Sequence, residues 1–391
     1  MKAICSLEGL VEQLKQEAAA TPAPSARRLA VAAGHDENTI QAAARAASEG
    51  IARVILVGER ARIEALCKEF RLDPGLFEVI NEPDEAKAGA KARDMVRDGE
   101  ADVLMKGLIG TDKYMHLILD KEKGLLPRGA VLTHLTVLDI PAYQKLHGKL
   151  LFVSDVAIIP APDLPTKVKI VEYCVAAAHT FGIDKPKVAL IAANEKVSDK
   201  MPATMEAAVI AKMADRGQIK GAVVDGPLAL DVALSPEACE IKGLKSSVEG
   251  AADVLVFPDI HAGNVFYKAA TVLAGARLAA VVMGTTAPCV LTSRADSEES
   301  KIYSIALGCR LAKGKSRPPA PAQSAFPVPL RGGFLFAPRG PGAGFFSLRE
   351  AFFARWVSGL SALACPRSRR AETPEATTQQ CVPGWGPSVS A

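Results

Sequence analysis

A run of hydroxyl, guanidinium and carboxylate side chains lies between residues 287 and 301. Thr292, Ser293 and Arg294 come just before an expected helix, whose free N–H groups and positive dipole end favour a bound anion. An arginine at that point can contact a phosphate through two hydrogen bonds, and helix capping alone does not call for one. The segment is therefore typical of a site for a phosphate or an acyl phosphate.

Acidic side chains follow directly, at Asp296, Glu298 and Glu299. Two interpretations of them are open. Asp296 and Glu299 have the spacing of a capping box, and acids are favoured in the first turn of any helix. Next to a bound substrate, a carboxylate can instead accept a proton during the reaction.

The elements that must position these side chains repeat along residues 27–311 as an apolar run, a turn and a helical stretch. Strands are expected at 29–33, 54–57, 103–105, 131–140, 150–153, 188–192, 222–224, 254–257 and 279–283. Helices are expected, among others, at 38–49, 164–181, 202–216 and 262–275. Nearly continuous apolar strands that alternate with helices indicate parallel sheets covered on both faces, so the predicted fold class is α/β.

Polar and glycine residues follow most of the expected strands, for example Gly34-His35-Asp36, Lys106-Gly107, Ser154-Asp155 and Asp225-Gly226. Ligands of open α/β sheets bind beyond the carboxyl ends of strands, although Gly and Asp are also common turn and cap residues. The chain contains neither GxGxxG nor a Walker A sequence, which weighs against the standard dinucleotide and nucleotide-phosphate sites.

The composition of the 391-residue chain, with 49% apolar and 23% charged residues, is that of a soluble globular protein. Its apolar runs stop well before 18 residues, and Glu8 and Glu12 interrupt the segment where a signal peptide would be apolar. The eight cysteines are far apart, without CxxC. We therefore expect reduced thiols, a cytoplasmic location, no metal site and no membrane partner.

The last 79 residues, 313–391, differ from the rest in charge and composition. They hold ten Lys and Arg against three Glu, and 11 Pro and 9 Gly. Because the whole chain is +4 and this tail is +7, the remaining residues sum to −3 and give no electrostatic case for nucleic acid. We expect the tail to be disordered. Three interpretations of it are open: an appended or membrane-touching segment, a partner-binding helix at 345–363, or a stretch without a selected function.

Several ordered motifs within residues 27–312 resemble the phosphate acetyl/butyryltransferase family, and within it the butyryltransferases. They are Lys212–Asp231 (KMADRGQIKGAVVDGPLALD), Pro258–Lys268 (PDIHAGNVFYK), Leu291–Ser297 (LTSRADS), Met105–Thr111 (MKGLIGT) and Ser154–Leu164 (SDVAIIPAPDL).

The resemblance implies reversible transfer of a short acyl group, butyryl favoured, between coenzyme A and inorganic phosphate through an acyl phosphate. It implies no cofactor, coenzyme A as a substrate, and a homo-oligomer. It also implies two parallel-sheet α/β domains with a cleft between them, similar to the isocitrate/isopropylmalate dehydrogenases. We expect residues 1–143 with 285–312 in the first domain and 144–284 in the second.

By the same resemblance, Ser293 and Arg294 hold the phosphoryl group and the carbonyl oxygen. The chain departs from the acetyltransferases in two places. Ser300 stands where they have the Asp that deprotonates the thiol, which leaves Asp296 and Glu299 as candidates. His116, five residues beyond Thr111, stands where they have a phosphate-binding Arg.

A neutral imidazole holds an anion less well than a guanidinium, so the missing charge is expected from another cation. The candidates are Lys106, Arg128 and His134. The remaining expected substrate-binding residues are Thr111, Asp225, Gly263, Asn264 and Thr292. For Gly263 and Asn264 a plain turn is the alternative, and for His116 a position on a helix face.

Two other functions remain open. A metal-dependent dehydrogenase of similar architecture would need Asp225, Asp231 and Asp259 around a divalent metal. A protein that binds coenzyme A or an acyl phosphate without turnover would be consistent with Ser300 and His116.

Overall fold

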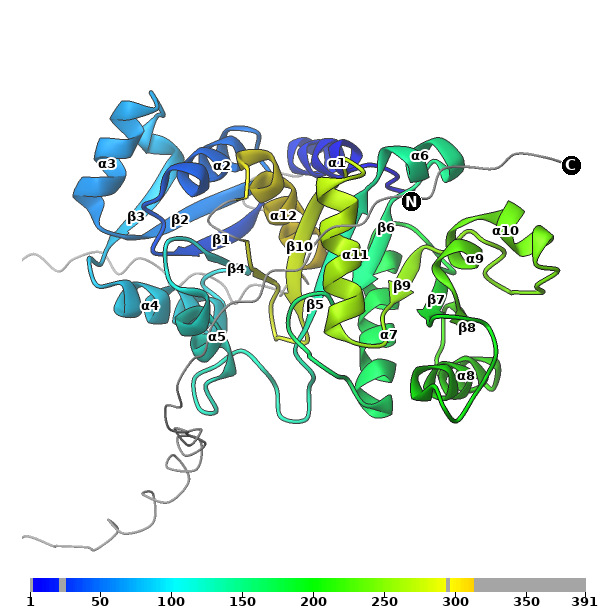
Figure 1. Ribbon diagram of the computed structural model, residues 1–391. Helices are drawn as coiled ribbons and strands as arrows, with labels where there is room; N and C mark the ends of the chain where they lie inside the picture. Colours follow the sequence, from blue (N-terminus) through cyan, green and yellow to red (C-terminus); the bar gives the residue numbers. More distant parts are fainter. Residues whose placement is uncertain (1–2, 21–25, 293–295, 313–391) are drawn as a thin grey trace, which may run out of the picture. The chain divides into compact units, whose positions relative to one another are not determined.

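Eleven strands form one sheet in the computed structural model, which describes residues 3–20, 26–292 and 296–312 (Figure 1). Its strand order is β3-β2-β1-β4-β11-β10-β5-β6-β9-β7-β8. The strands are β1 (Arg27–Ala32), β2 (Ala52–Gly58), β3 (Phe77–Asn81), β4 (Val103–Lys106), β5 (Thr133–Asp139), β6 (Leu151–Ser154), β7 (Lys187–Ile191), β8 (Val223–Leu228), β9 (Val254–Val256), β10 (Arg277–Met283) and β11 (Cys289–Val290).

The helices alternate with these strands along the chain. They are α1 (Leu7–Ala20), α2 (Glu37–Ser48), α3 (Arg60–Glu69), α4 (Glu85–Arg97), α5 (Thr111–Leu119), α6 (Pro141–His147), α7 (Leu164–Thr180), α8 (Pro202–Asp215), α9 (Leu230–Leu234), α10 (Pro236–Ile241), α11 (Ile260–Val272) and α12 (Glu298–Leu311), with a short 3₁₀ helix at Pro74–Leu76. This alternation confirms the predicted α/β class.

The sheet is parallel in two halves that meet around β10 and β5. The strands β1, β2, β3, β4 and β11 pair in parallel, and so do β6, β9, β7 and β8. Between them β10 is antiparallel to both β11 and β5, and β5 is antiparallel to β6. The start of β5 therefore lies beside the end of β6, which brings Thr133 and His134 to the residues that follow Ser154.

Alternate residues of each strand pack on opposite faces of the sheet, as the pleat requires. In β1, Leu29 and Val31 join the core with α2 and α12, whereas Ala30 and Ala32 join the core with α4 and α5. The first face is covered by α1, α2, α3, α7, α8 and α12. The second face is covered by α4 and α5 over one half and by α6, α9, α10 and α11 over the other (Figure 1).

Helix α12 is buried along most of its length, because it packs against β10, α2 and α1 together. Every residue from Lys301 to Cys309 is buried. Lys301 is 2% exposed, and its ammonium lies 3.8 Å from the Asp36 carboxylate at the start of α2. The chain thus returns, directly after residue 296, to the half of the sheet that contains β1 and β4.

The turn after β10 depends on Gly284. Its φ is +96°, a conformation that glycine adopts far more readily than other residues, and a Cβ there would lie 1.9 Å from the carbonyl oxygen of Val131. The close approach fixes the end of β10 against the segment that leads into β5.

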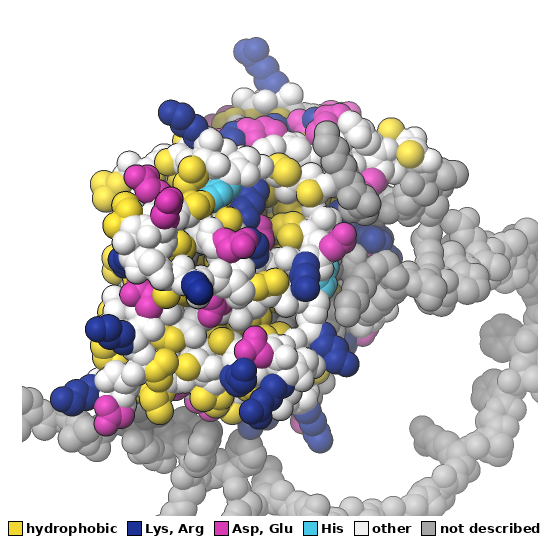
Figure 2. All heavy atoms as spheres, turned by 90° about the vertical axis from the view of Figure 1, so that its right-hand side faces the viewer, with side chains coloured by type: hydrophobic (Ala, Val, Ile, Leu, Met, Phe, Trp, Pro, Cys, Tyr) yellow, Lys and Arg dark blue, Asp and Glu magenta, His cyan; other side chains and the backbone are white. Residues whose placement is uncertain are grey.

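Two strands, β3 and β11, were not expected from the sequence. The predicted domain boundaries place β10 with the second domain, whereas β10 lies between β11 and β5 in the sheet. The division into two domains stays a prediction. Within the described ranges, no helix is both long enough and apolar enough to cross a membrane. On the face that carries α8 and α10, Lys and Arg side chains are interspersed with Asp and Glu (Figure 2).

Candidate active site

A buried carboxylate, that of Asp155, joins the end of β6 to the start of β5. Its Oδ2 atom accepts hydrogen bonds from the Thr133 hydroxyl at 2.7 Å and from the backbone N–H of His134 at 2.9 Å. Its Oδ1 atom accepts from the backbone N–H groups of Ala157 and Ile158, at 2.7 and 2.8 Å. Because four donors hold it and it is only 3% exposed, Asp155 fixes the geometry of this corner of the sheet.

The ring of His134 lies against this corner. His134 and Thr136 are two residues apart on β5 and so share one face, and Nδ1 of the ring lies 3.2 Å from the Thr136 hydroxyl. Nε2 has no hydrogen-bond partner among the described residues. Burial lowers the pKa of His134, and the negative charges of Asp155 and Asp296 oppose that effect. The ring is thus neutral near pH 7, so the positive charge expected at the site has to come from other side chains.

Asp296 interacts with three other segments of the chain, with two of them through its charge alone. Its charge acts on His134 of β5 and also on Tyr267 of α11, whose pKa is raised by burial first and by Asp296 second. Its backbone carbonyl lies 3.5 Å from the amide nitrogen of Asn38 in α2. Ser293 and Arg294 lie outside the described residues. The described residues on either side of this gap are Thr292, which is buried, and Asp296.

The start of α12 differs from the predicted capping box. The N-cap is Ser297, whose hydroxyl accepts a hydrogen bond from the backbone N–H of Ser300 at 3.2 Å. The assignment of Asp296 and Glu299 as a capping box is therefore wrong, because a serine one residue later takes the capping position. Glu299 instead accepts a hydrogen bond from the Tyr303 hydroxyl at 3.1 Å, one turn further along the helix.

Lys106 and Thr292 lie at neighbouring strand ends. Lys106 ends β4, and Thr292 follows β11 by two residues, while Val290 of β11 is paired with Met105 of β4. Both side chains are buried, at 3% and 4% exposed, and the Lys106 ammonium lies 3.3 Å from the carbonyl oxygen of Gly107. A lysine and a threonine on adjacent strand ends, next to the segment that carries Arg294, are suited to hold an anion.

Gly263 and Asn264 brace the Asp155 corner from α11. A Cβ on Gly263 would lie 2.3 Å from the carbonyl oxygen of Asp155, so only glycine allows this approach. The side-chain amide of Asn264 donates to the carbonyl oxygen of Val156 at 2.9 Å. Both residues lie in the first turn and a half of α11.

Thr111, His116 and Arg128 are exposed. Thr111 begins α5 and His116 lies on the exposed side of the same helix, while Arg128 follows in the loop that leads to β5. No described contact joins any of them to Asp155 or His134. His134, Gly263 and Asn264 thus lie around the Asp155 corner, and the charge of Asp296 acts on His134. Lys106 and Thr292 lie at adjacent strand ends.

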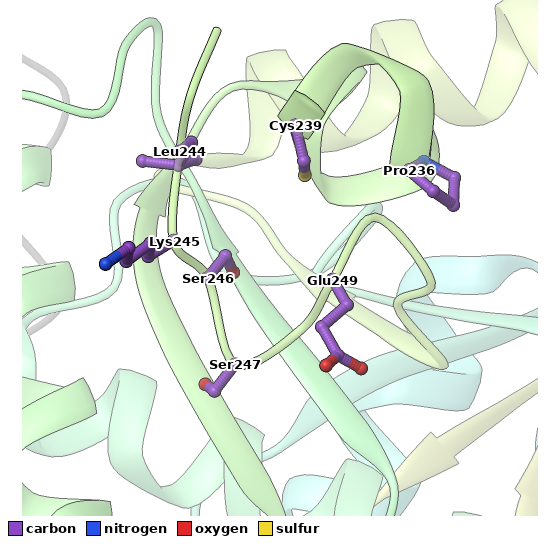
Figure 3. A pocket seen from close by; sticks show the side chains of 7 residues that line it. All are labelled: Pro236, Cys239, Leu244, Lys245, Ser246, Ser247 and Glu249. Atoms are coloured by element: carbon purple, nitrogen blue, oxygen red, sulfur yellow. The ribbon is translucent and has the colours of Figure 1, made fainter. Parts of the chain in front are cut away.

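Asp225 lies at the far edge of the sheet, on β8. Its carboxylate accepts hydrogen bonds from the Ser246 hydroxyl at 2.7 Å and from the backbone N–H of Ser247 at 3.0 Å. The loop it holds lines a surface hollow of about 510 Å³ together with Pro236 and Cys239 of α10 (Figure 3). None of the expected site residues lines this hollow, and Asp225 contributes to it only by holding Ser246 and Ser247.

The three aspartates needed by a metal-dependent dehydrogenase have separate partners. Asp231 pairs with Lys242, Asp259 caps α11 through the backbone N–H of Ala262, and Asp225 holds the loop already described. In the described part of the chain, no group of three His, Cys, Asp or Glu side chains could hold a metal ion.

Sequence reasoning did not include Asp155, Thr133, Thr136 or Ser154 among the site residues. The hydroxyls of Thr133 and Ser154 are 3.1 Å apart, and Ser154 also donates to the carbonyl oxygen of His134 at 2.9 Å. The available signal was the pair Ser154-Asp155 at the end of an apolar strand. The antiparallel pairing of β5 with β6, which brings these groups together, is not visible in either segment alone.

The sequence and the fold of the chain are similar to those of known proteins. A family model described as phosphate acetyl/butaryl transferase matches residues 10–91 and 84–309. The chain is 44% identical over 289 residues to a phosphate butyryltransferase of Clostridium acetobutylicum, which covers 74% of this chain and 94% of the relative. It is 44% identical over 281 residues to a phosphate acetyltransferase of Thermotoga maritima, covering 72% and 94%.

A solved structure, a branched-chain phosphotransacylase from Enterococcus faecalis, superposes with a TM-score of 0.64 at 31% identity. The alignment covers 73% of this chain and 98% of that one. The residues that the family model matches include the segment around residue 293, the strands β4 and β5, and Asp155. On this evidence the chain belongs to the phosphate acetyl/butaryl transferase family, which is a family of acyltransferases.

Proposed function

We propose that the protein reversibly transfers a short-chain acyl group between coenzyme A and inorganic phosphate, with butyryl preferred: acyl-CoA + phosphate = acyl phosphate + CoA. The match to phosphate butyryl- and acetyltransferases over residues 10–309 carries this proposal. The chemistry calls for an anion site beside a group that can move a proton. The proposal includes no metal or redox cofactor, and coenzyme A takes part as a substrate.

We assign Ser293 and Arg294 to the phosphoryl group and to the carbonyl oxygen on which charge develops. Preorganised donors at such an oxygen are usually the largest single contribution to catalysis. Lys106 and Thr292 support this assignment, because their buried side chains lie at the strand ends next to it. The two candidate carboxylates for the proton transfer are Asp296 and Glu299, and Glu299 also accepts a hydrogen bond from the Tyr303 hydroxyl.

The preference for one acyl chain over another is expected to be modest. Burial of each methylene contributes about 0.8 kcal/mol. Butyryl exceeds acetyl by two methylenes, which corresponds to about 1.6 kcal/mol or roughly 15-fold in relative kcat/KM. We therefore expect activity with both acyl phosphates.

We further propose that the protein forms a homo-oligomer. Val265 and Val272 of α11 and the adjacent Leu273 are 69%, 77% and 84% exposed, and a second copy of the chain would cover such side chains. We propose neither nucleic acid nor membrane as a partner, in keeping with the mixed charges of the face in Figure 2. A cytoplasmic location is consistent with the six described cysteines, all of which are free thiols.

The test is thioester formation from coenzyme A with butyryl phosphate and, separately, with acetyl phosphate, in the presence of a chelator. We expect rapid turnover with both and a higher kcat/KM with butyryl phosphate. Release of phosphate without coenzyme A serves as the control for simple hydrolysis. A folded protein that binds coenzyme A without turnover would instead be a binding protein, and activity that needs a divalent metal and NAD(P) would indicate the dehydrogenase.

A further inference from the structure

A cavity of about 570 Å³ lies where β1, β2 and β3 begin, at the opposite end of these strands from the edge that carries Lys106 and Thr292. The residues that line it include Arg28, Arg53, Glu78, Glu100, Ile55 and Met95. We propose that this cavity binds a free α-amino acid with an apolar side chain. The proposal goes beyond the proposed function and does not depend on it, because none of the residues assigned to the reaction lines the cavity.

Three charged side chains of neighbouring strands project toward the cavity from the same face of the sheet. Arg28, Arg53 and Glu78 each lie two residues before a residue of the core that β1, β2 and β3 share with α4, so all three are on that face. Arg28 is paired with Arg53 in the register of β1 and β2, and Glu78 is paired with Ile55 in that of β2 and β3. Like charges side by side on adjacent strands are destabilising. The two arginines therefore favour an anionic group between them.

The two arginines have N–H groups available for such an anion. Nε and Nη2 of Arg28 donate to the carboxylate of Asp102, both at 3.1 Å, and Nη2 also donates to the carbonyl oxygen of Gly99 at 2.7 Å. Within the described part of the chain, neither Nη1 of Arg28 nor the guanidinium of Arg53 has a hydrogen-bond partner. Asp102 thus fixes one guanidinium beside a second that is unpaired, and the free donors of both are suited to a carboxylate.

Two carboxylates line the same cavity. Glu78 on β3 and Glu100 after α4 are exposed, and neither has an ion-pair partner among residues 3–20, 26–292 and 296–312. A simple anion would face these two carboxylates, and a simple cation would face the two guanidiniums. A zwitterion satisfies both signs, because its carboxylate can bind Arg28 and Arg53 while its ammonium binds Glu78 or Glu100. The charges therefore favour an amino acid over either simple ion.

The cavity also has apolar walls. Ile55, Met95 and Phe77 line it and are only 5%, 8% and 9% exposed. Its volume lies within the range of about 300–1,000 Å³ that is usual for small-ligand sites. An aliphatic side chain such as that of leucine would cover these groups, whereas an acidic side chain would bring another negative charge toward the two carboxylates. These contacts favour an apolar amino acid.

The test is calorimetric titration of the full-length protein with L-leucine. We expect saturable binding with a Kd of about 1 mM or lower. Leucinamide, which has no carboxylate, and 4-methylpentanoate, which has no ammonium, should each bind at least about tenfold more weakly. Glycine, which has no side chain to cover the apolar walls, should also bind more weakly. Absence of saturable binding, or equal binding of leucinamide, would overturn the proposal.

Variants test whether the leucine occupies this cavity. Arg53→Gln and the double variant Glu78→Gln/Glu100→Gln should each weaken binding by about 10- to 100-fold, because each removes a charged partner of the ligand. Arg216→Gln, at an exposed arginine after α8, is the matched control and should bind leucine as wild type does.

Added coenzyme A or inorganic phosphate should leave the Kd for leucine unchanged, since the reaction is assigned to the other end of the strands. Displacement of leucine by either substrate, or wild-type affinity in both cavity variants, would overturn the proposal. The titration needs no turnover, so its outcome is independent of whether the proposed acyl transfer occurs.

Discussion

The carboxylate of Asp155 accepts a hydrogen bond from the backbone N–H of His134, at 2.9 Å. The side chain of Asp155, directly after β6, thus fixes the backbone of His134, the second residue of β5. The same carboxylate also takes the Thr133 hydroxyl and two N–H groups of its own loop. The site therefore depends on Asp155 for its geometry as well as for its negative charge.

Replacing Asp155 by Asn should destabilise the protein by roughly 3 kcal/mol. An amide presents an NH₂ group to N–H donors that need an acceptor, and it loses the charge that strengthens the four hydrogen bonds. Urea unfolding measures the change. Asp199→Asn, at an exposed aspartate, is the control and should alter the free energy of unfolding little. Equal effects of the two substitutions would contradict the anchoring role.

Replacing Arg294 by Ala should lower kcat for thioester formation by about 10²- to 10³-fold, the usual effect of removing one donor to a developing oxyanion. Steady-state kinetics with butyryl phosphate measures it. Arg216→Ala, at an exposed arginine after α8, provides the comparison. If Arg294→Ala raised KM alone and left kcat unchanged, Arg294 would serve binding and not the transition state.

Replacing Gly284 by Ala should destabilise the protein by at least about 2 kcal/mol, since the new Cβ combines an unfavourable φ with overlap of a backbone carbonyl. Gly217 separates the two effects. Its φ is +74°, and a Cβ there would meet nothing within 4 Å. Gly217→Ala should therefore cost only about 1 kcal/mol. Thermal unfolding of both variants gives the comparison, and similar shifts in Tm would rule out the steric explanation.

Stability should fall with decreasing pH in part because of His35. In the folded state the pKa of His35 is lower than the usual 6.5. Burial of the ring is the main cause, and the positive charge of Arg62 is the second. The unfolded chain then binds the proton more tightly, so the free energy of unfolding decreases as the pH drops below about 6.5. In His35→Gln this part of the pH dependence should disappear. Urea midpoints at about pH 7.5 and about pH 5.5 measure it, and His261→Gln, at an exposed histidine, should keep the wild-type difference.

Much of the fold was predictable because most strands are short apolar runs that are buried on both faces. β4 and β6 are examples in which every residue is buried. The missed strands do not have this pattern. β3, with the sequence FEVIN, has a single buried residue, and β11 has only two residues, so neither produces a run that stands out.

Site residues could be predicted only where the functional side chains and the strand or helix end that positions them lie in the same short segment of sequence. Asp296 and His134 were among the expected residues, but the electrostatic interaction between them joins segments that are 162 positions apart in the chain. The N-cap was misplaced because Asp296 and Ser297 are both good capping residues, and local sequence does not decide between them. Ser293 and Arg294 remain a prediction, outside the described residues.

The place of β10 in the sheet has a consequence for synthesis of the chain on the ribosome. β10 and β11 are made last among the strands, yet they fill the gap between β4 and β5. Until residue 290 has left the ribosome, both of those strands present unpaired N–H and C=O groups to other chains. The nascent protein therefore passes through a long interval in which two open strand edges coexist, and that interval is where aggregation or chaperone capture would compete with folding.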